Sequence, residues 1–302
     1  MIRPPPCGGR HGLVSQKAWR ARGARRFRSR RGGGGSTPTP PRNSRLRSTV
    51  FSRRRTSNRA RKMFSGLVSP HAGYIYSGPC AAHGYRLVQG RRYDVVVVIG
   101  LSHRVPGSVS VLNAESYVTP LGKIPIDREG ARRLIVSEDF IDDDAGLFSM
   151  EHSIEVQLPF LQRALPDLKV VLVSMRTMAR ERCERLAAAL DRVFGGRRVL
   201  YIASSDLSHF HSYDEARRLD LGVLERVRAM NLDGLADDCA TGRGEMCGIA
   251  PVLTVLELYK RSARGDAPKF CVIRTRAIRR ERATALSATA RWRCLPRMPR
   301  RR

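Results

Sequence analysis

Apolar residues between positions 66 and 262 follow two alternating periods. Short β-branched runs bounded by glycine or charged residues predict strands at 66–69, 94–100, 108–113, 169–175 and 198–203. Between them, apolar residues recur three or four apart, which predicts helices at 79–90, 128–137, 152–165, 179–194, 214–230 and 248–262. Strands that alternate with helices imply a mainly parallel sheet covered on both faces. We therefore expect a single α/β domain at 63–273, with a mainly parallel central sheet flanked by helices.

The positive charge of the chain, formally +29 over 302 residues, is confined to its two ends. Residues 1–62 hold 19 Lys and Arg and no acid, and residues 274–302 hold 11 Arg and one Glu. The stretch between them holds 26 basic and 26 acidic residues. Because the Arg-, Gly- and Pro-rich ends bury too little apolar surface to offset chain entropy, we expect both to be disordered. Basic arms can bind nucleic acid non-specifically, but a non-functional explanation, such as a mis-chosen start or a shifted reading frame, is the stronger one, so we expect no specific nucleic-acid partner.

Several other classes are disfavoured by what the sequence lacks. No apolar run approaches the length of a bilayer span, and the Arg-rich start has no uninterrupted apolar stretch of a secretory signal. We therefore expect a cytoplasmic protein that does not associate with membranes. The seven cysteines include no CxxC pair and are odd in number, which argues against a disulfide framework. No GxGxxG or GxxxxGK[ST] sequence follows a strand, so nucleotide use is not expected.

Potential metal ligands follow three of the apolar runs, in GLVSPH at 66–71, DVVVVIGLSH at 94–103 and VLYIASSDLSH at 199–209. Because the carboxyl ends of parallel strands meet at one edge of a sheet, we expect His71, His103, Asp206 and His209 to converge there. Neutral imidazole is the commonest metal-binding side chain. The alternative is that both strand-end histidines are hydrogen-bonded structural residues and that Ser204, Ser205 or Asp206 caps a following helix.

Two further patterns suggest proton transfer. Asp206 and His209 are three apart, so one helical turn would place them on the same face, as acid/base work or the orientation of a ligand histidine requires. His152 lies beside Glu151 and Glu155 at the start of a predicted helix, and such carboxylates raise the pKa of an imidazole. We expect His152 to donate a proton to a bound substrate, although carboxylates in a first helical turn also have a purely structural explanation.

Cys247 precedes a predicted apolar helix that begins near Ile249, in the sequence GRGEMCGIAPVL. A thiol at the amino end of a helix has a lowered pKa, which predisposes it to act as a thiolate ligand or a nucleophile. Packing as a small buried hydrophobe is the structural alternative.

Six segments occur in the order and spacing of one known family: PHAGYIYSGPCAAHGY, GLSHRVPGS, YVTPLGKIPID, EHSIEVQLPFLQ, ASSDLSHFH and MCGIAP. Over roughly residues 66–260 the chain resembles the Memo family, in particular its prokaryotic members named AmmeMemoRadiSam system protein B. That family is similar in fold to the class III extradiol ring-cleaving dioxygenases, a relation that does not by itself transmit function.

The resemblance implies a redox-active metal, iron as Fe2+ or alternatively copper, bound by His71, His103 and Cys247. It also implies that Asp206 and His209 lie close by. A thiolate in place of the carboxylate ligand of the dioxygenases favours copper or a different iron chemistry, so catechol cleavage does not follow.

The chain also departs from the family pattern. Residues 1–62 contain no AGxFYP-like element, Arg-rich sequence replaces the closing strand after Arg274, and Arg104 stands where some members have a second histidine.

These observations lead to one functional expectation and two alternatives. We expect metal-dependent, oxygen-linked redox chemistry on a small-molecule substrate, with His209, Asp206 and His152 as the catalytic candidates. The first alternative is a non-catalytic adaptor that binds a metal, a peptide or a protein partner at the same site. The second is a hydrolase in which Cys247, His71 and Asp206 form a nucleophilic relay.

Overall fold

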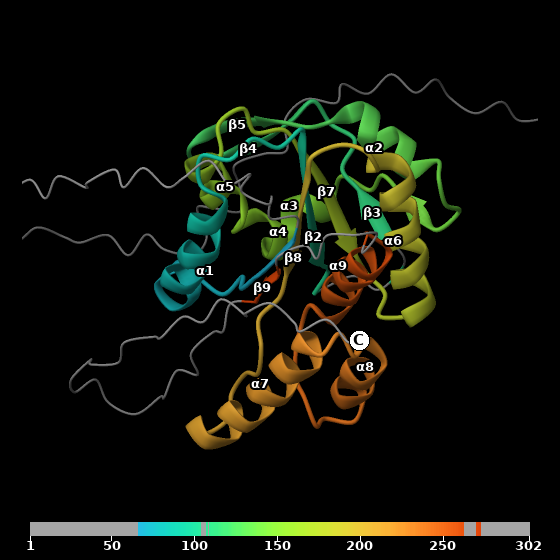
Figure 1. Ribbon diagram of the computed structural model, residues 1–302. Helices are drawn as coiled ribbons and strands as arrows, with labels where there is room; N and C mark the ends of the chain where they lie inside the picture. The colour runs from blue at the N-terminus through green and yellow to red at the C-terminus, as the bar shows by residue number, and fades with distance from the viewer. Residues whose placement is uncertain (1–65, 104–106, 108, 263–269, 273–302) are drawn as a thin grey trace, which may run out of the picture.

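A seven-stranded sheet forms the centre of the protein, in the order β6-β3-β7-β2-β8-β1-β9 (Figure 1). The computed structural model describes residues 66–103, 107, 109–262 and 270–272. Its strands are β1 (Gly66–Ser69), β2 (Val95–Leu101), β3 (Val109–Val111), β6 (Ile141–Asp142), β7 (Val170–Met175), β8 (Val199–Ser204) and β9 (Phe270–Val272). A two-stranded hairpin, β4 (Ser116–Thr119) and β5 (Gly122–Pro125), lies apart from the main sheet.

All neighbouring strands of the main sheet run parallel except β3 and β7, which are antiparallel. Both faces of the sheet are covered, and this explains the uninterrupted apolar sequence of β2. Val95, Val97 and Ile99 contribute to the hydrophobic cluster on one face, whereas Val96 and Val98 contribute to the cluster on the other. The predicted α/β class with a mainly parallel sheet is confirmed.

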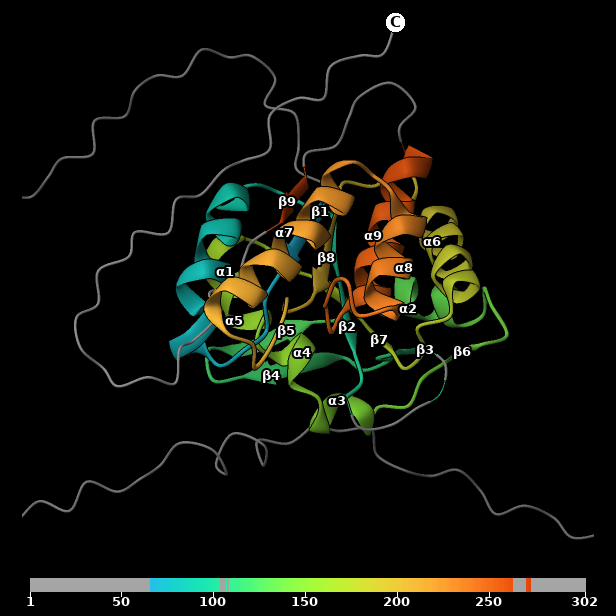
Figure 2. The same cartoon turned by 90° about the horizontal axis from the view of Figure 1, so that it is seen from below.

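The helices divide between the two faces of the sheet. One face is covered by α1 (Tyr74–Val88), α3 (Leu147–Met150), α4 (His152–Glu155) and α5 (Leu158–Ala164). The other is covered by α2 (Arg128–Ile135), α6 (Arg180–Phe194), α7 (Tyr213–Arg228), α8 (Leu232–Ala240) and α9 (Ile249–Ser262). In Figure 1, α7 and α8 lie below the sheet, and Figure 2 shows them in front of the strands when the protein is seen from that side.

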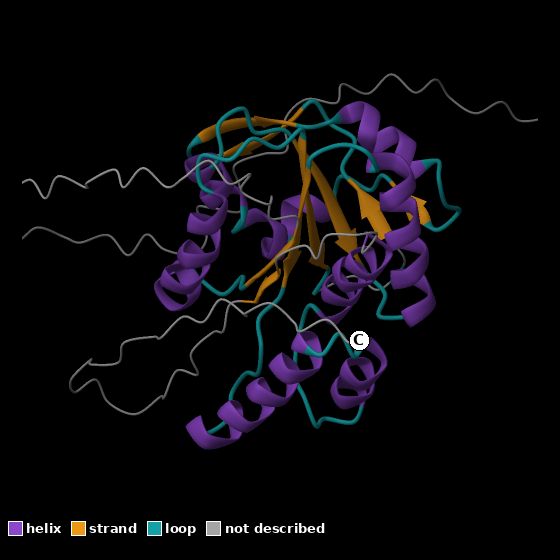
Figure 3. Cartoon of the chain, in the orientation of Figure 1, coloured by secondary structure: helices purple, strands orange, loops and turns teal. Residues whose placement is uncertain are grey.

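The five predicted strands correspond to β1, β2, β3, β7 and β8, with bounds that agree to within two residues. The predictions missed six shorter elements, which are β4, β5, β6, β9, α3 and α8; Figure 3 shows all the helices and strands of the described residues. The hairpin was missed because it is largely exposed: in β5 only Ile124 is buried, so the sequence has no apolar run that would predict a strand.

Two predicted helices have different bounds in the structure. The helix predicted at 152–165 is two short helices, α4 and α5, because Pro159 has no N–H for an intrahelical bond and stands in the first turn of a new helix. The helix predicted at 79–90 begins earlier, at Tyr74, with Pro79 inside it. The first turn of this helix is closed by the carbonyl of Gly73, which accepts hydrogen bonds from the backbone N–H groups of Tyr76 and Ser77.

The predicted tails at 1–62 and 274–302 lie outside the described residues, as does Arg104. Within the described ranges, no helix combines the length and the hydropathy needed to cross a bilayer.

Candidate metal centre

Three potential metal ligands meet at the carboxyl edge of the sheet. His71 follows the end of β1 by two residues, His103 follows the end of β2 by two residues, and Cys247 lies two residues before α9. Their ligand atoms all lie within 4.8 Å of one another. His71 is buried, Cys247 is half-buried and His103 is exposed, so solvent reaches the group from the side of His103. Asp206, which follows β8, lies beside His71.

Gly248 allows Cys247 to reach the strand ends. A Cβ atom at Gly248 would lie 2.3 Å from the carbonyl oxygen of Ser204 and 2.6 Å from Cβ of Ser205, so a side chain would not fit there. The backbone N–H of Gly248 instead donates to Oγ of Ser205 at 2.9 Å, and the backbone N–H of Asp206 donates to Sγ of Cys247 at 3.2 Å. The close approach of α9 to β8 therefore fixes the position of the thiol.

His71 presents one ring nitrogen to the thiol and the other to the protein interior. Its Nε2 lies 3.2 Å from Sγ of Cys247, and its Nδ1 lies 2.9 Å from Oγ of Ser204. Burial lowers the pKa of His71 to about 4, against the opposing charge of Asp206, so the imidazole is neutral at pH 7. A neutral imidazole is the form that binds a metal.

Glu151 orients His103. Its carboxylate accepts hydrogen bonds from the backbone N–H of His103 at 2.8 Å and of Ser153 at 2.9 Å. Burial opposes the charge of Glu151, but the hydrogen bonds from His103 and Ser153 outweigh it and lower the pKa to about 2. Nδ1 of His103 lies 2.9 Å from this acceptor-only carboxylate and must therefore carry a proton, so that in a neutral ring the lone pair is on Nε2.

The expected lowering of the Cys247 pKa was wrong for the metal-free thiol. Burial, together with the charge of Asp206, raises the pKa of Cys247 to about 11. Desolvation of the thiolate outweighs the helix dipole because the sulfur is enclosed between the end of β8 and the start of α9. The thiol is therefore protonated at neutral pH, and its hydrogen can point to Nε2 of His71.

Asp206 and His209 are close, but not on a helix. Residues 205–212 are irregular and α7 begins only at Tyr213, with Ser212 as its cap, so the expected helical turn was wrong. Oδ2 of Asp206 nevertheless lies 3.5 Å from Nε2 of His209, while Oδ1 accepts the backbone N–H of His71 at 2.9 Å. The hydrogen bond to Asp206 raises the pKa of His209, and Glu245 adds to the effect.

His152 lies at the open side of the group. Its ring stacks on that of His103 with centroids 4.8 Å apart, and its side chain is 51% exposed. His103, Glu151 and His152 form a second set of potential ligands, but the Glu151 carboxylate is already occupied by His103 and Ser153. His152 is placed to contact a molecule bound next to His103.

Comparison with known proteins shows the family of the chain. Residues 41–285 match the Memo-like protein family. The chain is 41% identical over 205 residues to a MEMO1 family protein of Methanobrevibacter smithii, covering 67% of this chain and 73% of that protein. It is 33% identical over 216 residues to a MEMO1 family protein of Caldivirga maquilingensis, covering 70% of this chain and 76% of that one. The chain belongs to the Memo family.

One solved structure is similar to this Memo-family chain at a lower level. It is an uncharacterized protein of Escherichia coli, matched with a TM-score of 0.40 and 18% sequence identity over 59% of this chain and 82% of that one. A likeness of this degree carries no argument about the site.

The donor set of the Memo-family chain suits a metal ion. Atoms bound to one ion at metal–N and metal–S distances of about 2.0–2.3 Å lie roughly 3.3–3.6 Å apart in tetrahedral geometry. The separation of 3.2 Å between Nε2 of His71 and Sγ of Cys247 is close to this spacing, and all three ligand atoms lie within 4.8 Å of one another. Two imidazole lone pairs and a thiol facing one point therefore fit a metal with open coordination positions.

Sequence reasoning missed the residues that hold these ligands. Gln157 and Glu245 were not singled out, and Ser204 was named only as a possible helix cap, although each makes hydrogen bonds at the site. The signal for Ser204 was its place at a strand end, two residues before Asp206, and Gln157 had none.

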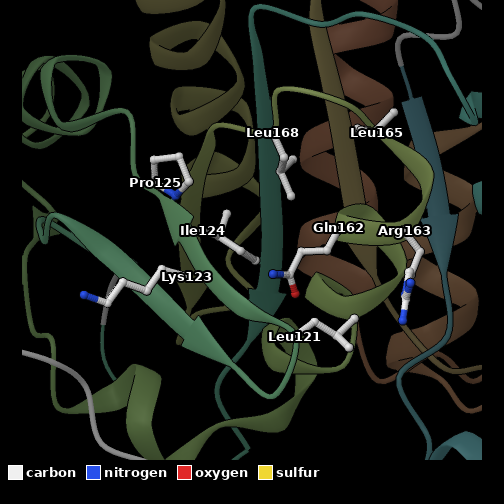
Figure 4. Close-up of a pocket in the computed structure, with 8 residues that line it drawn as sticks. All are labelled: Leu121, Lys123, Ile124, Pro125, Gln162, Arg163, Leu165 and Leu168. Atoms are coloured by element: carbon white, nitrogen blue, oxygen red, sulfur yellow. The ribbon is translucent and has the colours of Figure 1, made fainter.

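A separate cavity of about 360 Å³ lies at the opposite, amino end of the sheet, between the β4–β5 hairpin and α5 (Figure 4). Its lining consists of Leu121, Lys123, Ile124, Pro125, Gln162, Arg163, Leu165 and Leu168. None of the candidate site residues contributes to it, so this cavity is not part of the metal centre.

Proposed function

We propose that this Memo-family chain binds iron, or alternatively copper, through His71, His103 and Cys247 and carries out oxygen-linked redox chemistry on a small molecule. The observation that carries the proposal is the convergence of the three ligand atoms within 4.8 Å. Imidazole ligands suit both metals and a thiolate favours a soft or redox-active ion, whereas the all-oxygen environment preferred by magnesium is absent from this ligand set. A metal of this kind would supply one-electron and oxygen chemistry when bound.

The remaining polar residues account for substrate positioning and proton transfer. His209 lies between the carboxylates of Asp206 and Glu245, and its side chain is 39% exposed. It can hold a proton at Nε2, directed at Asp206, next to the three ligands. The ring of His152 stacks on that of His103 and its side chain is 51% exposed, so we propose that it contacts a small molecule that approaches from solvent. We propose His209, Asp206 and His152 as the catalytic residues.

The first experiment is a metal analysis of the anaerobically purified protein by mass spectrometry. We expect near-stoichiometric iron or copper, lost in His71→Ala and in Cys247→Ser. Cys239→Ser is the matched control, because Cys239 is also a half-buried free thiol but lies on α8. A folded protein that takes up no metal after reconstitution would refute the proposal. Oxygen consumption with candidate small molecules then tests catalysis, and metal uptake without turnover would favour a non-catalytic adaptor.

A second candidate is a thiol nucleophile, favoured by the contact of 3.2 Å between Cys247 and His71. The orientation of His71 counts against it, because Nδ1 contacts the hydroxyl of Ser204 and not a carboxylate. In a nucleophilic triad the base is normally oriented by such a third group on its far nitrogen. Rapid labelling of Cys247 by an electrophile in the metal-free protein would support this alternative.

We also propose a cytoplasmic location. Cys183, Cys239 and Cys247 are free thiols, which fits a reducing compartment. Imaging of a fluorescent fusion tests this, and an extracytoplasmic signal would refute it.

A further inference from the structure

We propose that Ser204 and Gln157 are positioning residues that hold the ring proton of His71 on Nδ1 and thereby direct the lone pair of Nε2 toward Cys247. Both are fully buried, at the end of β8 and just before α5. This inference deepens the proposed metal-binding function and rests on it for its consequence, but the position of the proton is a property of the metal-free protein and is tested there.

The argument begins with Gln157, whose orientation is fixed by its neighbours. Its Nε2 lies 3.0 Å from the carbonyl oxygen of Pro70, which can only accept, so this atom is the amide nitrogen. Its Oε1 accepts from the hydroxyl of Tyr85 at 2.6 Å. The second amide hydrogen then points at Oγ of Ser204, at 2.8 Å. Gln157 is therefore a donor to Ser204.

The hydroxyl of Ser204 has one proton and two lone pairs, and each has an assigned partner. The proton is donated to the carbonyl oxygen of Ser153 at 2.5 Å, since a carbonyl can only accept. One lone pair accepts from Gln157. The other faces Nδ1 of His71 at 2.9 Å. Because Ser204 has no proton left to give, this contact is a hydrogen bond only if Nδ1 of His71 carries the hydrogen.

The opposite tautomer of His71 is disfavoured for the same reason. With the proton on Nε2, a lone pair of Nδ1 would face a lone pair of Ser204 in a site that excludes water, since His71 is 2% exposed and Ser204 is 0% exposed. A buried polar group without its hydrogen bond carries a substantial desolvation cost. The buried chain from Tyr85 through Gln157 and Ser204 therefore sets the tautomer of His71.

This tautomer prepares Nε2 of His71 to bind a metal without a rearrangement of its ring protons, so that only the Cys247 thiol has to lose a proton. Nε2 of His71 lies 3.2 Å from the Cys247 sulfur, so the nitrogen and sulfur donors already face one another. Hydrogen bonds that fix the far nitrogen of a ligand histidine typically contribute 10- to 100-fold to metal affinity. We expect a loss of that size when the hydroxyl of Ser204 is removed.

The test uses the full chain labelled with ¹⁵N-histidine and two measurements. In the metal-free wild-type protein, ¹⁵N NMR should show His71, assigned with the His71→Ala variant, protonated on Nδ1 and bare on Nε2. In Ser204→Ala the two tautomers should be mixed, and the affinity for Co(II), measured by competition with a chromophoric chelator, should fall 10- to 100-fold. Ser204→Thr keeps the hydroxyl and should restore both readouts.

Ser174→Ala is the matched control. Ser174 is also a fully buried serine in a sheet strand, and its hydroxyl has no hydrogen-bond partner among the described residues. The control should change neither the tautomer nor the affinity. Wild-type His71 protonated on Nε2 would overturn the proposal without any variant, and so would a Ser204→Ala protein that matches Ser174→Ala in both readouts. If wild-type protein has the Nδ1 proton but binds no metal, the proposed function fails while the assignment of the proton stands.

Discussion

Replacing Gly248 with alanine tests whether the close approach of α9 to β8 sets the geometry of the metal centre. The added Cβ would lie 2.3 Å from the Ser204 carbonyl oxygen, 2.6 Å from Cβ of Ser205 and 2.9 Å from its Cα. Ordinary contacts between such atoms are about 3.3–4.0 Å. The start of α9 must therefore move by about 1 Å to accept a single methyl group.

Two effects of this displacement are expected in Gly248→Ala. Overpacking of a buried contact lowers the free energy of unfolding by about 1–3 kcal/mol. Cys247 is the preceding residue and moves with the backbone, whereas metal–ligand distances tolerate changes of only about 0.2 Å. We therefore expect metal affinity to fall on the order of 10- to 100-fold, a loss as large as that caused by removing a group that orients a ligand.

The assays are urea denaturation, which reports the free energy of unfolding, and competition with a chromophoric chelator, which reports metal affinity. Gly222→Ala is the control, because Gly222 lies inside α7 and a Cβ there would have no described atom within 4 Å. That substitution should raise the free energy of unfolding by about 0.5–1 kcal/mol, since alanine favours a helix over glycine, and should not change metal binding.

The reasoning is refuted if Gly248→Ala unfolds with the same free energy as the wild-type protein and binds metal equally well. A loss of stability with unchanged metal affinity would show that α9 can move without displacing the thiol, and would contradict the claim that Gly248 positions Cys247.

Three further predictions concern the orientation of His103, the pH dependence of stability and the effect of metal. Glu151→Gln replaces one acceptor oxygen by an NH2 group, which cannot accept a hydrogen bond from the N–H groups of His103. Metal affinity, measured by competition with a chelator, should therefore fall about 10- to 100-fold. An unchanged affinity would contradict the role of Glu151 in orienting His103. Burial opposes the charge of Glu138, but hydrogen bonds from Arg192 and Arg185 outweigh it and lower the pKa of this carboxyl group. The carboxylate therefore stabilises the folded state at pH values above its ordinary pKa, and this stabilisation is lost as the pH falls through the lowered pKa. In urea titrations, the free energy of unfolding should be about 1 kcal/mol lower in Glu138→Gln than in wild type at pH 7, and this difference should shrink below about pH 4. A difference that grows as the pH falls would contradict the stabilising role of Glu138. Addition of metal at 100 times its Kd should raise the free energy of unfolding by about 2.7 kcal/mol in wild type and not in Cys247→Ser, as measured by thermal denaturation.

The sheet was readable from the sequence because its central strands are buried on both faces. Such strands need nearly continuous apolar residues, and the sequences of β1, β2 and β8 have them. The β4–β5 hairpin lacks this signal, because its strands are partly exposed and depend on tertiary contacts such as the hydrogen bond between Thr119 and Gln162. Local pattern therefore predicted the five inner strands of the main sheet, and missed its two short edge strands β6 and β9 as well as the hairpin.

The candidate site was readable only in part, for a related reason. His71 and His103 could be placed together because strand ends share an edge of the sheet. The hydrogen bonds of Ser204 to Gln157 and to His71 join residues 47 and 133 positions apart, and no local pattern encodes them. The raised pKa of Cys247 likewise depends on burial by the end of β8, which the sequence of α9 does not reveal.

The separation of the three ligands along the chain has a consequence for biosynthesis. Cys247 follows His71 by 176 residues, so a chain that emerges from the ribosome carries His71 long before the thiol that faces it in the folded protein. At about 5–20 residues per second, this delay is about 9–35 s. During that time the early strands have only imidazoles to offer, and the complete ligand set exists only when α9 has been made and has docked. A metal bound as proposed would therefore be held by all three ligands only at this late stage, and its identity would depend on the ions available at that moment.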